Sequence, residues 1–210
     1  MRIIDADVIA AMARVPRANF VNGLSGFKSA CLVGTAGTDG LPNLSLFSSA
    51  VHVGANPPLL GIISRPPSVP RHTLSNLRAA GVFTLNHIHA GIWEAAHQTS
   101  AKYDAQTSEF AAVGLTPYYA PGFAAPFVAE ARLRIGLAYE WECRLPNDCV
   151  LVIGQIQFVE VPDGAVGEDG YVDIESLETV AISGLDGYHS TRRLGRLAFA
   201  EPGKTPERIA

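Results

Sequence analysis

Short apolar segments separated by glycine and proline turns run along most of the chain, and this pattern limits the possible folds more than any other feature. The segments 30–35, 59–63 and 82–88 have the length and composition of strands, and 44–53 follows an Asp-Gly turn that predicts a hairpin with the first segment. The segment 150–161 is long and mostly apolar, as expected of a central strand or of one covered at an interface. Many strands with few helices favour a closed antiparallel barrel over alternating strands and helices.

The second half of the chain adds two half-exposed strands. Apolar and charged residues alternate over 127–135 and again over 139–145, which places them on opposite faces of a strand. Short helices are predicted over 6–13 before Pro16, 92–97 and 108–112. No repeat or long linker divides the sequence, so we expect one mainly β domain over 1–210 with a few short peripheral helices.

Composition excludes several classes of partner. A net charge of -4 offers no broad basic surface for nucleic acid. The three cysteines have no CxxC spacing, so neither a disulfide framework nor a thiolate zinc site is expected. The N-terminus carries acids where a secretion signal would be basic, and no apolar run approaches the ~20 residues of a membrane span. We therefore expect a cytoplasmic protein without a membrane partner.

A cluster of cationic residues precedes one predicted helix. Thr73 is a favourable N-cap, apolar residues follow at helical spacing, and Gly81 ends the segment. The first amides of a helix attract anions, and Arg65, Arg71 and His72 would add charged donors for a phosphate monoester. The alternative is an ordinary surface helix with solvated arginines.

A second cluster of polar residues lies at the end of a predicted strand. Asn43, Ser45, Ser48 and Ser49 follow one another closely in PNLSLFSSAVHV. Small polar side chains with accessible backbone amides suit the edge of a flat heterocycle that is rich in hydrogen-bonding atoms. The alternative is a serine-rich strand end that faces water.

Several segments in a fixed order carry a resemblance to a known family. They are GTAGTDGLPNLSLFSSAVHVGANPPLLGIISRP, PRHTLSNL, FTLNHI, AHQTSAKYDAQTSEF and ISGLDGYHSTRRLGRLAFAEP. Together they resemble the flavin reductase-like, FMN-binding split-barrel proteins over nearly the whole chain. The resemblance implies a Greek-key split β-barrel, a homodimer, and FMN held non-covalently in a cleft near the dimer interface.

The same resemblance, added to the two polar clusters, predicts the cofactor-binding residues. They are Asn43, Ser45, Phe47, Ser48, Ser49, Val51, Arg65, Arg71, His72, Thr73, Asn86, His97, Ser100 and Lys102. The resemblance implies that Ser48, Ser49 and the backbone near Val51 border the flavin ring. It also implies that His97, Ser100 and Lys102 lie in a loop that closes over the flavin. Lys102 would lie near the N1 and O2 edge of the ring and stabilise the reduced anion; the alternative is a surface lysine.

Three functional hypotheses follow. The first is an FMN-dependent oxidoreductase in which NAD(P)H or another donor reduces the flavin, with no side chain required as nucleophile or proton donor. The second is an FMN-binding electron carrier or flavin store without its own substrate. The third is a metal site on the HxH pair His87 and His89, joined by His52 or His97. Near the C-terminus, Asp186, Tyr188 and 192–196 are expected to form a helix start and a dimer contact, or to reach the neighbouring FMN.

Overall fold

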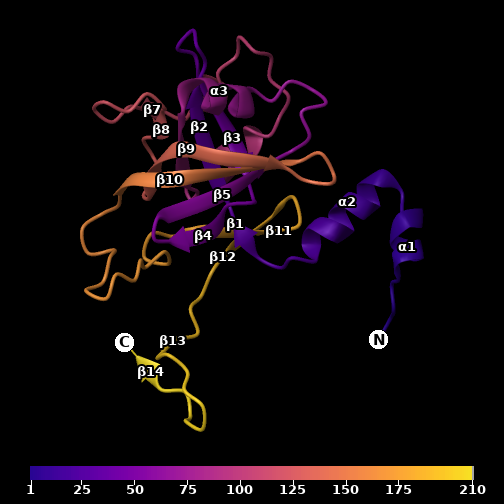
Figure 1. Cartoon of the computed structure of the whole chain (residues 1–210), viewed down its shortest axis with the longest axis vertical. Helices are drawn as coiled ribbons and strands as arrows, with labels where there is room; N and C mark the ends of the chain where they lie inside the picture. Colours follow the sequence, from indigo (N-terminus) through magenta and orange to yellow (C-terminus); the bar gives the residue numbers. More distant parts are fainter. Residues whose placement is uncertain (210) are drawn as a thin grey trace.

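One antiparallel sheet of seven strands forms the centre of the computed structural model, which describes residues 1–209 (Figure 1). In their order across the sheet the strands are β3 (Pro42–Phe47), β2 (Cys31–Ala36), β6 (Val82–His87), β9 (Arg134–Arg144), β10 (Val150–Glu160), β5 (Pro58–Ser64) and β4 (Val51–Ala55). The long apolar segment predicted to be a central strand is β10, which pairs with β9 on one side and β5 on the other. That prediction is confirmed.

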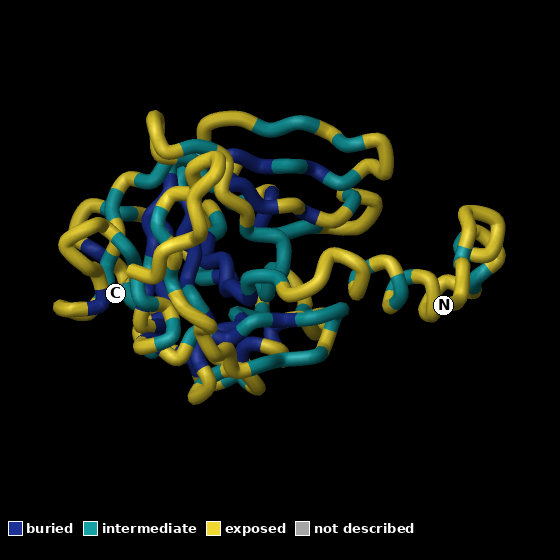
Figure 2. Tube along the Cα trace, turned by 90° about the horizontal axis from the view of Figure 1, so that it is seen from below, coloured by how far each residue is buried: buried dark blue, intermediate teal, exposed yellow. Residues whose placement is uncertain are grey.

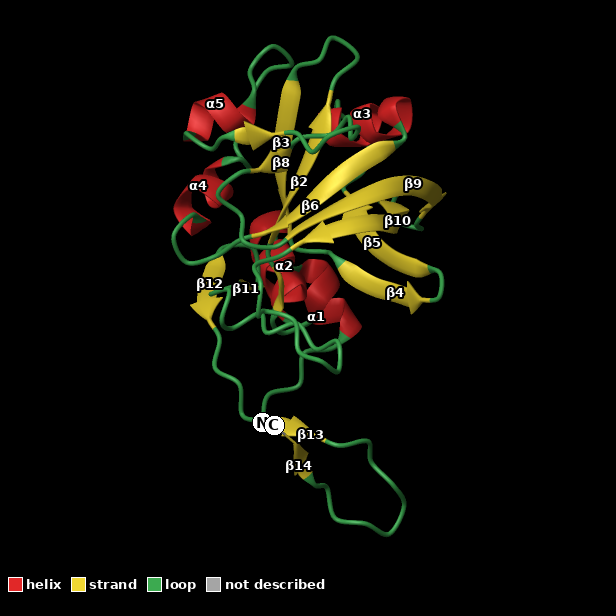
Figure 3. Ribbon diagram, turned by 90° about the vertical axis from the view of Figure 1, so that its left-hand side faces the viewer, coloured by secondary structure: helices red, strands yellow, loops and turns green. Residues whose placement is uncertain are grey.

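The connection between the two edge strands makes this sheet curl. β3 and β4 lie at opposite edges of the sheet, yet only residues 48–50 join them. A chain that short spans at most about 15 Å, so the two edges must approach each other. Figure 3 shows the strands fanning from β3 round to β4. Since β3 and β4 do not pair with each other within residues 1–209, the barrel is split at this point.

Smaller elements surround the barrel. The remaining strands are β1 (Lys28–Ser29), β11 (Val180–Ser183) and β12 (Gly187–Ser190), which form one small sheet, and the pairs β7 (Pro117–Tyr118) with β8 (Phe127–Val128) and β13 (Arg196–Leu197) with β14 (Arg208–Ile209). The helices are α1 (Ala6–Ala11), α2 (Arg14–Gly23), α3 (His72–Ala80), α4 (Trp93–Gln98) and α5 (Glu109–Val113). The first two have no buried residue and project from the body as an exposed arm (Figure 2).

Two apolar clusters cover the two faces of β2, which explains its unbroken apolar sequence. Val33 packs inside the barrel with residues such as Leu85 and Leu137. Its neighbour Leu32 points the opposite way, into a second cluster that includes Phe110 of α5. Because successive side chains of a strand alternate between faces, a strand buried on both faces must be apolar at every position.

The alternation over 127–135 led to a wrong strand prediction. Only Phe127–Val128 is a strand there, and the chain then turns, with the amide of Ala131 donating to the carbonyl of Val128 at 3.1 Å. The regular strand begins at Arg134 and continues to Arg144, so one long strand replaces the two that were predicted. A turn that crosses the core buries alternate residues as a strand does, and the sequence pattern does not separate the two.

Three other boundaries differ from the sequence predictions. The first helix ends at Ala11, and a second runs through Pro16, because proline in the first turn lacks only an N–H that has no helical partner. The predicted hairpin strand 44–53 ends at Phe47, and the rest of it pairs with β5 as β4. The helix start expected near Tyr188 is strand β12.

Candidate functional site

The N-terminal end of α3 is open to a ligand, although it is built differently from the prediction. The helix begins at His72, with Arg71 at the N-cap position and no side chain bonded to the first amides. Thr73 is buried in the first turn, and Asn43 Nδ2 donates to its Oγ1 at 3.0 Å. Thr73 is therefore not the N-cap. The helix end at Gly81, in the left-handed conformation, is confirmed.

A buried polar network fixes this helix end against the sheet. Asn43 of β3 also donates to Thr35 Oγ1 of β2 at 3.2 Å, and Asn76 of α3 donates to the same oxygen at 3.3 Å. The Asn43 amide therefore links two strands to the first turn of the helix. Such hydrogen-bonded networks hold their members in one arrangement.

The cationic residues predicted for this site lie at the start of α3 or shortly before it in the chain. Arg71 is half-buried, and its Nε donates to the carbonyl of Pro66 at 3.1 Å, while Arg65 is exposed. The hydroxyl of Thr107 and the amide of Gln106 lower the pKa of Asp104, and His72 adds a smaller electrostatic contribution. The end of the loop 99–108 reaches the same place, since Ser108 donates to the carbonyl of Pro42 and the adjacent Asn43 donates to Thr73.

The edge of β3 is partly covered by α5. The buried Glu109 carboxylate accepts from the amide of Leu44 at 3.0 Å, and Ser108 Oγ donates to the carbonyl of Pro42 at 2.6 Å. Burial raises the pKa of Glu109, and the Leu44 N–H opposes that shift. Because backbone groups of a strand repeat every two residues, the N–H of Leu46 faces the same edge as that of Leu44, and neither Glu109 nor Ser108 is bonded to it. The sequence analysis missed Glu109, since its only signal is an acid in the first turn of a short helix.

The two serines of the connection 48–50 have different surroundings. Ser49 Oγ accepts from the amide of Ile63 at 3.0 Å and donates to the carbonyl of the same residue at 3.2 Å, so Ser49 fixes the connection to β5. Ser48 is half-buried and Val51 is 46% exposed, so both lie at the surface beside the split in the barrel. Ser45 is also half-buried, whereas Phe47 packs against the barrel core.

Asn86 is not part of this surface. Its side chain is fully buried and donates to the carbonyl of Leu32 at 3.1 Å and to Thr84 Oγ1 at 2.9 Å. Its oxygen accepts from the amide of Val128 at 3.0 Å. With donors and acceptor all engaged, Asn86 ties β2, β6 and β8 together, and we leave it out of the site.

The three residues predicted for a closing loop are exposed, at the end of α4 and just beyond it. His97 lies in the last turn of α4, and Ser100 and Lys102 follow it. His97 Nδ1 lies 3.1 Å from the hydroxyl of Tyr188. The same loop continues to Ser108, which donates to the carbonyl of Pro42 next to Asn43, the partner of Thr73. The structure thus brings the loop and the start of α3 together.

The two histidines of the HxH pair are used differently. His89 is buried; its Nδ1 accepts from the amide of Gly91 at 3.0 Å, and its Nε2 lies 3.1 Å from the carbonyl of Glu130. His87 is mostly buried, and its Nδ1 has no hydrogen-bond partner in the described structure. Within residues 1–209, no three His, Cys, Asp or Glu side chains are grouped in a way that would hold a metal ion.

The buried His87 should make stability depend on pH. Burial lowers its pKa from 6.5 to about 4, so the unfolded chain binds a proton more readily than the folded one between these values. The part of the free energy of unfolding that depends on neutral His87 is fully present above pH 6.5. It is lost progressively as the pH falls to about 4, by up to roughly 3 kcal/mol. Urea unfolding of the H87L variant should show a weaker loss of stability over this range, whereas the exposed-site control H52Q should follow the wild type. Identical pH dependence for H87L and wild type would contradict this.

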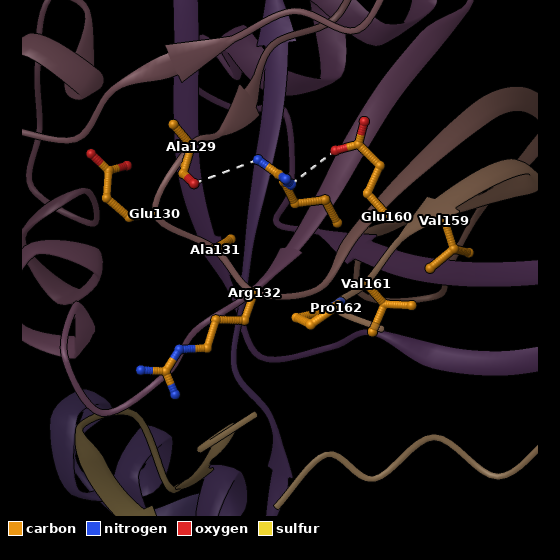
Figure 4. Close-up of a pocket in the computed structure, with 9 residues that line it drawn as sticks. Ala129, Glu130, Ala131, Arg132, Val159, Glu160, Val161 and Pro162 are labelled. Atoms are coloured by element: carbon orange, nitrogen blue, oxygen red, sulfur yellow. Dashed lines mark hydrogen bonds and ion pairs between the residues drawn. The ribbon is translucent and has the colours of Figure 1, made fainter. Parts of the chain in front are cut away.

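A cavity of about 560 Å³ lies elsewhere, between the end of β10 and the turn after β8 (Figure 4). Its lining residues are Ala129, Glu130, Ala131, Arg132, Arg134, Val159, Glu160, Val161 and Pro162. The charges in it are already paired: Arg134 Nε lies 2.9 Å from Glu160, and Arg132 pairs with Glu178 at 2.6 Å. It contains none of the predicted cofactor residues, so the opening at α3 is the better candidate.

Comparisons with known proteins agree with the fold. A family model described as flavin reductase like domain matches residues 24–177. A solved structure from Shewanella frigidimarina, described as a flavin reductase with split barrel domain, is 48% identical, with a TM-score of 0.92 over 95% of this chain and 100% of that one. Nitrilotriacetate monooxygenase component B from Bacillus cereus is 21% identical, with a TM-score of 0.83 over 94% and 98% of the two chains. Flavoredoxin of Desulfovibrio vulgaris is 24% identical, with a TM-score of 0.71 over 85% and 94%. The last two show the fold alone. The split barrel expected from the sequence is confirmed.

Among residues 1–209, no helix has the length and apolar character needed to span a membrane.

Proposed function

Because the chain belongs to the flavin reductase-like domain family, we propose that it is an FMN-dependent oxidoreductase that takes electrons from NADH or NADPH. The observation that carries this proposal is the uncapped start of α3, with Arg71 and His72 beside it and the open end of β3 next to it. FMN supplies the redox chemistry when bound. The protein binds it, orients it and surrounds it with charge.

The groups at the start of α3 fit a phosphate. The free helix amides and the guanidinium of Arg71 are donors, and the positive end of the helix dipole favours an anion. Asn43 donates to the Thr73 oxygen, which leaves the Thr73 hydrogen free to donate in turn. The nearby carboxylates are bonded to other donors, Glu109 to Leu44 and Asp104 to Thr107. A phosphate monoester would therefore meet donors.

The edge of β3 fits a flat, polar ring. Glu109 covers the N–H of Leu44, but the N–H of Leu46 farther along the strand faces the unpaired edge of β3, at the split in the barrel. Ser48 and Val51 reach the surface beside it. Backbone groups at an open edge can bond to the polar rim of a heterocycle. In this account Lys102, on the exposed loop after α4, supplies a positive charge near the ring.

We also propose a homodimer, in which a second copy covers the outer face of β4, β5, β10 and β9. Val51 and Val53 of β4 and Ile153 of β10 meet over Gly61, where an added Cβ would lie 3.2–3.3 Å from all three. Trp141, paired with Ile153, continues this apolar face and is 56% exposed. A contiguous apolar face of this kind is unusual on a monomer surface.

The W141D variant tests the dimer. A charge within the proposed interface has no partner there, so the variant should sediment as a 22.3 kDa monomer at micromolar concentration, whereas the wild type should sediment at twice that mass. The W141F control keeps an apolar ring and should remain dimeric. Wild-type protein that sediments as a monomer would rule out the proposed dimer.

A second candidate function is an electron carrier without its own substrate. The groups at the start of α3 favour it equally, because they would hold the phosphate of FMN and take no part in the electron transfer itself. The two functions differ in whether NADH or NADPH is consumed. FMN should be titrated into the purified protein, and the visible spectrum should then be followed after NADH or NADPH is added without oxygen. Bleaching faster than that of free FMN supports the reductase, bound flavin that does not bleach supports the carrier, and failure to bind flavin excludes both.

A further inference from the structure

An aromatic cluster joins the end of α4 to the small sheet. The hydroxyl of Tyr188, in β12, lies 3.1 Å from Nδ1 of His97, and the two rings meet edge to face with centroids 5.7 Å apart. Trp93, in the first turn of α4, also packs on Tyr188, with ring centroids 5.2 Å apart. Tyr188 thus contacts two residues, one turn apart, on one face of a short helix.

One direction of this hydrogen bond, with the Tyr188 hydroxyl as donor, leaves His97 with an N–H donor toward the solvent. Burial, with a smaller contribution from Asp186, raises the pKa of Tyr188 to about 12, so its hydroxyl keeps its hydrogen. When that hydroxyl donates to Nδ1 of neutral His97, the imidazole hydrogen must be on Nε2. The side chain of His97 is exposed, so Nε2–H is a donor available to a ligand.

We infer that Tyr188 is a positioning residue that fixes His97 as a hydrogen-bond donor toward the bound cofactor or its electron donor. The inference rests on the proposed function, because the loop after His97 carries Ser100 and Lys102 and ends at Ser108, which is bonded to Pro42 beside the start of α3. The acceptor is a carbonyl oxygen, which both a flavin ring and a nicotinamide carboxamide provide. A residue far along the chain thereby sets the direction of a donor at the site.

The Y188F variant tests this directly, with W93F as a control that keeps the Tyr188 hydroxyl. Long-range proton–nitrogen NMR of the His97 ring should show the Nε2–H tautomer in the wild type and W93F, and a mixture of both tautomers in Y188F. Signals are assigned with an H97A sample. An unchanged tautomer in Y188F would overturn the inference, and this readout does not depend on flavin binding.

Kinetics then locate the acceptor. If the acceptor is the nicotinamide, Y188F should raise the KM for NADH or NADPH about five- to tenfold. If the acceptor is the flavin, Y188F should instead raise the Kd for FMN by the same factor. In the H97A background the same substitution should have no further effect. A Y188F effect that persists without His97 would contradict the positioning role. If the wild type binds no flavin, the proposed function fails, while the NMR result still decides whether Tyr188 orients His97.

Discussion

Replacing Arg71 by alanine is expected to weaken FMN binding about a hundredfold. The guanidinium is held at the start of α3 by the bond from its Nε to the carbonyl of Pro66, so its remaining N–H groups are available to a phosphate. A charge-assisted hydrogen bond is worth about 1.5–3 kcal/mol, and 2.7 kcal/mol corresponds to a factor of about a hundred. Quenching of flavin fluorescence during titration measures the change.

Two controls separate phosphate recognition from general damage. Arg78 lies at the other end of the same helix and pairs with Glu142 at 2.6 Å, so R78A should leave FMN affinity unchanged. Riboflavin lacks the phosphate, so R71A should leave riboflavin affinity unchanged as well. Equal weakening of FMN and riboflavin by R71A would show that Arg71 does not bind the phosphate.

Substituting Gly34 by alanine should destabilise the fold by roughly 3 kcal/mol or more. A Cβ at this position would overlap the carbonyl oxygen of Pro126 and lie 2.5 Å from Thr84 Oγ1. These two groups are hydrogen-bonded to each other at 2.6 Å beside strand β2, so neither moves without breaking that bond. Overpacking against backbone exceeds the usual cost of an added methyl group in a core. Urea unfolding should report the loss, together with reduced soluble yield.

Gly23 offers the matched control for this substitution. It lies at the end of α2, and an added Cβ there meets nothing within 4 Å. G23A should be neutral or stabilise the protein by up to about 1 kcal/mol, because alanine is favoured over glycine in a helix. G34A and G23A variants of equal stability would contradict the packing described around β2.

The sequence predicted what depends on local pattern. The strands from Pro58 to Ser64 and from Val82 to His87, and the helix that ends at Gly81, lie close to their predicted positions. Glycine turns and apolar periodicity determine such elements over a few residues. The mainly β split barrel followed from the same patterns together with the family resemblance.

The parts that could not be predicted depend on contacts between distant residues. Threonine is favoured at the N-cap position of helices, which made Thr73 the predicted cap. Instead Asn43, far away in sequence, binds its hydroxyl, and the helix starts one residue earlier. Glu109 caps the edge of β3 only because α5 folds against that strand. The pairing of His97 with Tyr188 likewise joins residues 91 positions apart. No local pattern encodes these partners.

A crystal structure of the protein with FMN tests the central claim most directly. The account predicts the phosphate within hydrogen-bonding distance of the first amides of α3 and of Arg71, with the ring along the end of β3 beside Ser48. Flavin bound instead in the charged cavity lined by Arg134 and Glu160, or with its phosphate away from α3, would contradict it.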